Sequence, residues 1–377
     1  MASTSRLVWL FALLLLPASL VSAQDIASTI TGTVTNADTG EPIADAHVFI
    51  ANSMNGTVTD AQGNYRLTGV PLGTLQLYVS IVGYEPQNRN LFLRRTDFYR
   101  EDFEMKEAIV SIGEITVTTD NEKWKRQLEK FITLFIGETP NAQETEIVNP
   151  EVLDFSSAGG SFTAQASEPL IIENKALGYR IQYFLKDFNA TPNRTQYDGE
   201  PLFEELSAES PEQKALWKAR RDSAFYGSFR HFMLALLSDR VEEQGFKMFS
   251  RPGSTSNLSS GGTGGMRVLQ GNQRFPVKRS DILKDGEADD QKVLDFDGFV
   301  EIVYTKEEEA QAYLDWSGRP PGSRPRFRTS LISVDKGPAI VDMKGDVLNP
   351  YGVTFYQYLA FERVGDEVPK EYRPWNE

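Results

Sequence analysis

The early part of the chain alternates apolar and polar residues in short runs separated by turn residues. In the clearest run every second position is apolar: Leu75, Leu77, Val79 and Ile81. This period of two places the side chains on one face of a strand. Similar runs are TITGTVTN, AHVFIAN, YRLTGV, LFLRR, FYREDFEM and GEITVTT. Many brief strands with frequent turns predict an antiparallel β-sandwich between residues 24 and 119.

The stretch TDAQGNY, residues 59–65, fits either a calcium loop or a tight turn. A calcium loop needs six or more oxygen ligands, and this stretch offers one carboxylate. We therefore predict a hairpin turn, in which Gly63 takes a positive φ and Asp60 accepts hydrogen bonds from the following amides. Tyr65 and Leu67 would then point to the same face.

These motifs resemble the carboxypeptidase regulatory-like domain. The family's G-x-V, T-G-x-P, A-x-V, T-D-x-x-G-x-F/Y and V-G-Y motifs correspond to Gly32 and Val34, Thr39 to Pro42, Ala46 and Val48, Thr59 to Tyr65, and Val82 to Tyr84. The resemblance implies a transthyretin-like sandwich of seven or eight strands, with a carbohydrate-binding-like fold. It implies little about function, because this module is attached to many unrelated proteins.

In peptidases this module follows a zinc catalytic domain, which needs an H-x-x-E pair and a second histidine as ligands. The chain has two histidines, His47 and His231, and neither is followed by Glu three residues later. The ligand count therefore excludes a zinc carboxypeptidase. Strand alternation places His47 opposite Val48, on the solvated face, in a structural role.

The module also precedes the plug and barrel of some TonB-dependent outer-membrane receptors, and IGEITVTTD resembles the segment that follows it there. The residues after Thr119 are too few for a plug and a barrel of about 22 strands at roughly ten residues each. We keep the location that the resemblance suggests, which is the envelope of a Gram-negative bacterium.

Residues 120–377 predict an α+β domain with a mostly antiparallel sheet and one long helix. A first helix follows the N-cap Thr119 and ends at Gly137. The strands PLIIEN and GYRIQYFLKDF form a hairpin. Ser210 caps the long helix, which runs to Gln244 with a kink or a break at Gly227. Its expected apolar stripe is Leu216, Ala219, Tyr226, Phe229, Met233 and Leu236.

Later segments predict further strands: GFVEIVYT, RFRTSLISVD, PAIVDMKGDVLN with a turn at DMKGD, and YQYLAFERV. Residues 254–265 are a Gly/Ser-rich loop, and residues 317–326 are a Pro-rich connector. Segments of this domain resemble the C-terminal half of secreted bacterial proteins that carry the same sandwich. That resemblance implies no activity.

Composition and charge restrict the location and the partners. Residues 1–23 have the pattern of a signal peptide that is cleaved before Gln24, and no later stretch approaches transmembrane length. The chain has no cysteine and a net charge of -14. Nucleic acid is therefore disfavoured as a partner. Stability must come from core burial rather than from disulfides.

Three groups of residues are candidates for chemistry. Ser228 and His231 are three apart on a helix, but mid-helix amides cannot form an oxyanion hole, so we expect a helix-surface His that pairs with the sheet or with acids such as Glu242. The acids of the 281–299 stretch predict a solvated loop rather than a calcium site or a carboxylate dyad. The remaining candidates are two tryptophans in or near loops that could stack on sugars. The residues of the last two groups are Asp285, Glu287, Asp289, Asp290, Asp295, Asp297, Trp316 and Trp375.

The sequence therefore assigns no catalytic, cofactor-binding or metal-binding residue and no cofactor. We expect a non-enzymatic exported envelope protein, periplasmic or associated with the outer membrane or extracellular. Its α+β domain would bind an envelope protein or a glycan. Two alternatives stay open. One is a glycosidase-type hydrolase, whose two carboxylates would leave no sequence signature, and the other is a glycan-binding accessory protein.

Overall fold

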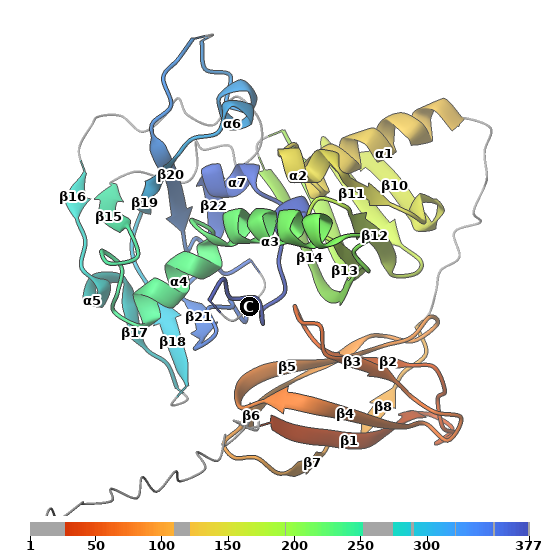
Figure 1. The fold of residues 1–377 in the computed structure, drawn as a ribbon. Coiled ribbons are helices and arrows are strands. Elements are labelled where there is room, and N and C mark those ends of the chain that lie inside the picture. The colour runs from red at the N-terminus through yellow and green to blue at the C-terminus, as the bar shows by residue number, and fades with distance from the viewer. Residues whose placement is uncertain are drawn as a thin grey trace, which may run out of the picture.

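The computed structural model describes residues 27–108, 121–192, 194–251, 274–287, 290–320, 322–349 and 351–375. Figure 1 shows the N-terminal sandwich beneath a larger α+β region that contains two main sheets. The predicted signal peptide, the N-cap Thr119 and the loop 254–265 lie outside the described residues.

The N-terminal part is a sandwich of two four-stranded sheets, as predicted. One sheet has β1 at its centre, antiparallel to β4 and parallel to β7 and β8. The other has the order β3-β2-β5-β6. The core between them includes Ile30, Val34, Leu67 and Leu77. The strands are β1 (Ala27–Asn36), β2 (His47–Ile50), β3 (Gly56–Val58), β4 (Asn64–Pro71), β5 (Gly73–Ser80), β6 (Gln87–Leu93), β7 (Phe98–Arg100) and β8 (Phe103–Met105).

The TDAQGNY stretch is a tight turn, but it is not the turn of a hairpin. A carboxylate oxygen of Asp60 accepts hydrogen bonds from the amides of Gln62 (2.9 Å) and Asn64 (2.8 Å), and Gly63 has φ +73°. Tyr65 and Leu67 are buried on one face, as predicted. The hairpin prediction was wrong because β3 pairs with β2 and β4 pairs with β1. The turn therefore carries the chain from one sheet to the other.

A six-stranded sheet begins the α+β region. Its order is β10-β11-β13-β12-β9, with β14 on β13, and the predicted β12–β13 hairpin is present. Phe131 and Phe135 of the first helix pack against Tyr183 and Phe188 of β13. The elements are α1 (Asn121–Phe135), α2 (Pro140–Gln143), β9 (Thr145–Ile147), β10 (Leu153–Ala158), β11 (Ser161–Ala166), β12 (Leu170–Asn174), β13 (Tyr179–Thr191) and β14 (Arg194–Glu205).

The predicted long helix is two helices, α3 (Pro211–Phe225) and α4 (Phe229–Leu237). The break falls at Gly227, which has φ +79° and where an added Cβ would lie 2.8 Å from the Tyr304 ring and 3.0 Å from the Arg328 guanidinium carbon. Ser210 caps α3 as predicted. The end at Gln244 was wrong, since α4 ends at Leu237.

The apolar stripe predicted for the long helix was wrong along α3. Leu216 is 50% exposed, whereas Trp217 and Arg221 face the six-stranded sheet. The Arg221 guanidinium lies 4.0 Å from the Tyr179 ring centroid and donates to the Leu177 carbonyl at 2.7 Å. A buried, stacked arginine thus occupies a position that the pattern assigned to solvent.

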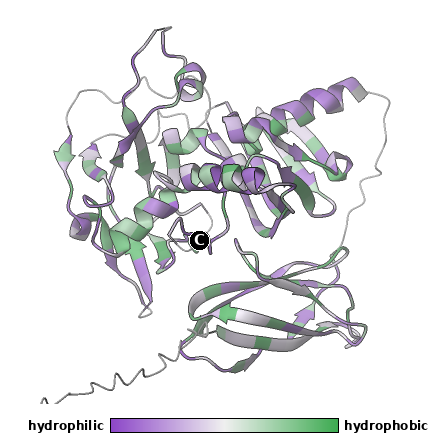
Figure 2. Ribbon diagram, in the orientation of Figure 1, coloured by the Kyte–Doolittle hydropathy of each residue, from purple (hydrophilic) through white to green (hydrophobic). Residues whose placement is uncertain are grey.

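A second, five-stranded sheet has the order β16-β15-β19-β20-β22, and a small sheet β17-β18-β21 lies beside it. The apolar helix α4 packs on these sheets (Figure 2). DMKGD is a turn, as predicted, with Val341 bridged to Val347. The elements are β15 (Phe246–Arg251), β16 (Phe275–Pro276), α5 (Arg279–Ile282), β17 (Leu283–Asp285), β18 (Gln291–Leu294), β19 (Phe299–Glu308), α6 (Gln311–Trp316), β20 (Phe327–Ser333), β21 (Ala339–Asp342), β22 (Thr354–Gln357), α7 (Tyr358–Phe361) and the 3-10 turn η3 (Val364–Asp366).

The strand predicted at YQYLAFERV was wrong beyond its start. β22 ends at Gln357, which has φ +63°, and the next four residues form α7. The amide of Leu359 bonds the Ser330 hydroxyl at 3.1 Å. The chain turns at this point, so the residues after Phe361 run between the two main sheets.

The sandwich docks on the six-stranded sheet. Phe49 and Tyr78 project from β2 and β5 onto Phe184 of β13, with ring centroids 4.7 and 5.8 Å apart. Beside them Ser53 forms a parallel bridge with Leu202 of β14. We call these contacts the dock. The face of β2 that was predicted to be solvated is therefore covered.

Gly63→Ala tests the close approach in the TDAQGNY turn. The added Cβ would meet the Val34 carbonyl oxygen at 2.5 Å, whereas Gly40, also at positive φ (+71°), has nothing within 4 Å. We expect Gly63→Ala to lower the free energy of unfolding by about 2–4 kcal/mol and Gly40→Ala by about 1 kcal/mol. Urea unfolding followed by circular dichroism measures both. Equal losses would contradict the steric argument.

Candidate functional site

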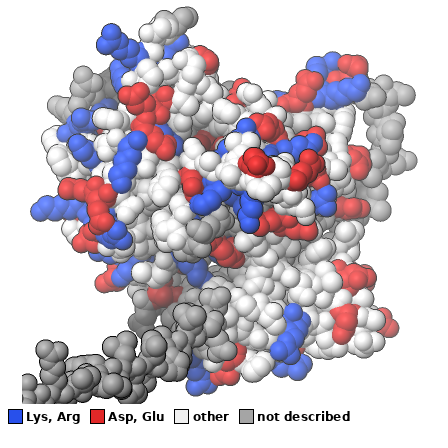
Figure 3. All heavy atoms as spheres, viewed as in Figure 1, with Lys and Arg blue, Asp and Glu red and all other residues white. Residues whose placement is uncertain are grey.

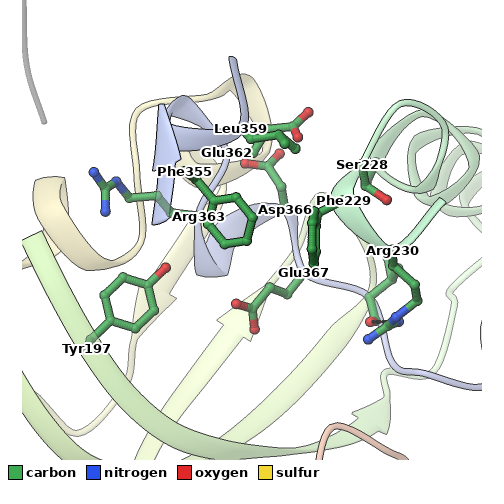
Figure 4. Close-up of a pocket in the computed structure, with 12 residues that line it drawn as sticks. Tyr197, Ser228, Phe229, Arg230, Phe355, Leu359, Glu362, Arg363, Asp366 and Glu367 are labelled. Carbon is green, nitrogen blue, oxygen red and sulfur yellow. Dashed lines mark hydrogen bonds between the residues drawn. The ribbon is translucent and has the colours of Figure 1, made fainter. Parts of the chain in front are cut away.

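A cavity of about 200 Å³ lies where the two main sheets of the α+β region meet. Side chains from β14, the junction of α3 and α4, β22, α7 and the segment after α7 line it (Figure 4). Its lining residues are Tyr197, Ala224, Ser228, Phe229, Arg230, Phe355, Leu359, Glu362, Arg363, Asp366, Glu367 and Val368. Cavities with apolar walls and a few converging polar groups are the usual location of ligand sites.

Three carboxylic acids of the cavity come from one short segment: Glu362, Asp366 and Glu367. Hydrophobic neighbours in this segment, Phe361, Val364 and Val368, are buried. Their packing draws the segment between the sheets and half-buries the acids. Figure 4 shows Glu367 between Tyr197 and Phe229.

Each of these acids has a different environment. Glu362 is paired with the buried Arg328, which also bonds Glu307 at 2.8 Å. Asp366 accepts hydrogen bonds from the Thr139 hydroxyl (2.9 Å) and the Asn141 amide (3.0 Å). Glu367 has Arg230 as its favourable charged neighbour, and no hydrogen bond to its carboxylate is found among the described residues.

Burial raises the pKa of all three carboxyl groups. The pKa of Glu362 rises to about 7, although Arg328 opposes the rise, and that of Asp366 rises to about 6 against its two hydrogen-bond donors. The pKa of Glu367 rises to about 7, with the neighbouring Asp366 adding to the effect of burial. Near neutral pH the set therefore both donates and accepts hydrogen bonds, which suits a ligand rich in hydroxyl or amino groups.

One of the sequence candidates, Ser228, lies at this site, but it is not part of a catalytic pair. Ser228 lines the cavity and is the N-cap of α4, with its hydroxyl accepting from the His231 amide at 3.2 Å. The expectation that it lies mid-helix was wrong because the helix breaks at Gly227. The hydroxyl is occupied in capping, a structural role.

His231 is buried, which corrects the expectation of a helix-surface histidine paired with acids such as Glu242. Its Nδ1 accepts from the Gly227 amide at 3.0 Å, and its Nε2 lies 3.2 Å from the Gln244 side-chain oxygen. Burial lowers its pKa to about 4, against the hydrogen bond to Gln244. The neutral ring supports the break between α3 and α4.

His47 lies at the dock. Its ring meets Phe184 edge-on, with centroids 5.6 Å apart, and burial lowers its pKa despite the nearby Asp45. It is on the opposite face from Val48, as predicted, but the α+β region covers that face. The role is packing between the two parts of the chain.

The predicted acidic loop is mostly solvated. Asp285 is exposed and paired with Lys292, and Glu287 is exposed. Asp290 instead accepts a hydrogen bond from Thr74 of the sandwich. Asp289 lies outside the described residues. Within the described part of the chain no group of three or more His, Cys, Asp or Glu is placed to hold a metal.

The other carboxylate and aromatic candidates are separate from the cavity. From the sequence, Asp295 and Asp297 flank Phe296 and would share one face of a strand, but this was wrong because they follow β18 in a loop. Asp295 pairs with Lys284. Trp316 packs on Tyr313 and Phe361. Trp375 is 61% exposed. Acidic and basic side chains are intermixed on the face shown in Figure 3.

Sequence reasoning missed Glu362, Asp366 and Glu367. The available signal was the stretch FERVGDEV, in which three acids are interspersed with apolar residues that favour burial. The strand predicted at YQYLAFERV contained Glu362 and ended before Asp366 and Glu367. Only the turn after Gln357 directs them inward.

Residues 29–106 match the carboxypeptidase regulatory-like domain, so the sandwich is identified as a domain of that family. The chain is 28% identical over 147 residues to the TonB-dependent receptor SusC of Bacteroides thetaiotaomicron, covering 36% of this chain and 14% of the receptor. It is 37% identical over 108 residues to a TonB-dependent receptor of Formosa agariphila, covering 28% of this chain and 10% of the receptor. The chain thus spans a small part of the relatives that it matches.

Among solved structures, a cohesin–X-dockerin complex from Acetivibrio cellulolyticus matches with 18% identity and a TM-score of 0.19, covering 21% of this chain and 58% of that chain. A catechol 1,2-dioxygenase from Acinetobacter matches with 12% identity and a TM-score of 0.20, covering 24% and 55%. Such low TM-scores carry no conclusion about function.

Glu367→Gln tests the raised pKa of the carboxyl. Because the folded-state pKa lies above the ordinary value of 4.5, the folded state binds the proton more tightly, and this contribution to stability is lost as the pH rises toward 7. The amide keeps the shape and cannot ionise. From about pH 5 to about pH 8 we expect the variant to gain roughly 2 kcal/mol in unfolding free energy relative to the wild type.

Urea unfolding at each pH measures this gain. The control Glu129→Gln, on the exposed side of α1, should give a profile parallel to the wild type. A Glu367→Gln profile that is also parallel would contradict the argument that the cavity disfavours the carboxylate.

Proposed function

We propose that the protein is a non-enzymatic, exported protein of the cell envelope. Its α+β region binds an envelope protein or a glycan in the carboxylate cavity, and the regulatory-like sandwich supports that region. The observation that carries this proposal is the cavity itself, which places a half-buried Glu367 without a hydrogen-bonding partner in the described structure among aromatic and arginine side chains. Perturbed carboxyl groups in a cavity mark functional sites.

The envelope location is part of the proposal. The N-terminal pattern of residues 1–23 favours export, and the two relatives are TonB-dependent receptors. No helix in the described part of the chain is long and apolar enough to cross a membrane. We place the protein in the periplasm or at the outer membrane of a Gram-negative bacterium, with the sandwich at 24–119 and the α+β domain at 120–377.

A carboxylate-based hydrolase is the second candidate, because the cavity holds three acids and glycosidases use a raised carboxyl pKa for their general acid. The contacts of two of these acids favour binding instead. Arg328 holds Glu362, and Thr139 and Asn141 hold Asp366. Only Glu367 then lacks such contacts, whereas the hydrolytic mechanism needs two available carboxyl groups.

The glycan-binding alternative now points to the cavity rather than to a surface row of aromatics. Trp316 is partly buried and packs in a cluster with Tyr313 and Phe361. A glycan partner would instead meet Phe229, Phe355 and the carboxyl groups inside the cavity.

The test uses the chain without residues 1–23 on a bacterial glycan array and in cross-linking to envelope proteins. We expect the wild-type chain to retain one glycan class or one protein. Glu367→Gln should retain at least tenfold less of it, and Glu129→Gln should retain as much as the wild type. Reducing ends released by the wild type but not by Glu367→Gln would establish the hydrolase instead. Retention unaffected by Glu367→Gln, or no retention, would overturn the proposed site.

A further inference from the structure

One short segment joins the cavity to the dock. Glu362, Arg363 and residues 366–368 line the cavity, and the next residues bind the sandwich. The amide of Lys370 donates to the Asn52 carbonyl at 2.7 Å, and a carboxylate oxygen of Glu371 accepts from the Met54 amide at 3.3 Å. The cavity acids and the two residues that contact the sandwich loop thus lie within one segment, residues 362–371.

The same sandwich loop is fixed from its other side by β14. Asn52 donates to the Pro201 carbonyl at 3.0 Å, and Phe203 donates to the Ser53 carbonyl at 2.9 Å. β14 also supplies Tyr197 to the cavity. The loop is therefore held between two elements that both line the cavity.

A chain of buried charges runs parallel to this backbone connection. Arg230 lines the cavity, donates to the Val368 carbonyl at 2.9 Å and pairs with Asp346 at 3.3 Å. Asp346 also lies 3.7 Å from the ammonium group of Lys370. The side chain of Lys370 is 6% exposed, so this ion pair is buried.

Because of these connections, the sandwich loop and the segment 362–371 cannot move independently of each other. If the sandwich loop leaves, the amide of the buried Lys370 loses its acceptor, and an unsatisfied buried group costs about 1–3 kcal/mol. The segment would relax to solvate this amide, and Arg230 and Val368 would move with the segment. A buried ion pair that loses one partner is strongly destabilised.

We propose that the sandwich sets the shape of the cavity: docking of residues 52–54 holds the segment 362–371, and opening of the dock releases the cavity acids. The sandwich then acts as a positive effector of whatever the cavity binds, and binding in the cavity strengthens docking in return. The coupling stands whether the cavity binds or hydrolyses its ligand, and its test needs no ligand.

Hydrogen exchange of the chain without residues 1–23, read by mass spectrometry, tests the coupling. Phe49→Ala changes only the sandwich side of the dock, so that an effect at the cavity must cross the dock. The reporting amides lie beyond the direct contacts: Gly365, which donates to Ile136 at 2.9 Å, Asp366 and Glu367. Phe98→Ala is the control, since this ring is 72% exposed on β7, in the other sheet of the sandwich.

We expect Phe49→Ala to speed exchange at least tenfold at 365–367 as well as at 52–54, and Phe98→Ala to change neither. Phe184→Ala removes the ring that β13 contributes to the dock and leaves the sandwich sequence unchanged. It should give the same pattern, which covers the case in which Phe49→Ala destabilises the sandwich itself. Fast exchange at 52–54 with wild-type rates at 365–367 would overturn the coupling. Wild-type rates at 52–54 in both variants would overturn the aromatic dock as its basis.

Discussion

The contact of Phe49 and Tyr78 with Phe184 joins two parts of the chain that each have a hydrophobic core of their own. Buried aromatic side chains contribute about 1.5–3 kcal/mol each, and favourable ring pairs add about 0.5–1.5 kcal/mol. Ser53, in the sandwich loop beside this contact, is fully buried. The sandwich loop bonds both β14 and the segment 362–371, and both of these elements line the cavity.

Burial of charge is the second constraint. The chain carries a net charge of -14, yet it places Glu362, Asp366 and Glu367 away from bulk water. Arg328 compensates Glu362 and, because it also donates to the Tyr226 carbonyl at 3.0 Å, ties α7 to the break between α3 and α4. Compensation is incomplete at Glu367. A site that leaves one acid uncompensated is suited to receive a donor from outside the chain.

The sequence was sufficient for elements whose partners are close along the chain. Alternation at Leu75, Leu77 and Val79 predicted the buried face of β5, and the turn residues after Asn174 predicted the β12–β13 hairpin. These patterns depend on local sterics and on which face meets the core. The motif resemblance added the sandwich topology, which periodicity cannot supply.

The cavity and the dock could not be predicted in this way, because both arise from contacts between distant segments. Phe49 alternates with core residues and looked like an ordinary outward position, and the pairing of β3 with β2 rather than β4 is a matter of topology. Arg221 is buried because it stacks on Tyr179, whereas a pattern of hydrophobic and polar positions predicts that an arginine is exposed. The acids after Phe361 face inward only because the chain turns at Gln357.

Differential scanning calorimetry of the chain without residues 1–23 tests most directly whether the sandwich and the α+β region behave as one unit. If the dock couples them, the wild type unfolds in a single transition, and Phe184→Glu, which places a charge among the aromatic rings, splits it into two. Two separate transitions in the wild type, at temperatures unchanged by Phe184→Glu, would contradict this account.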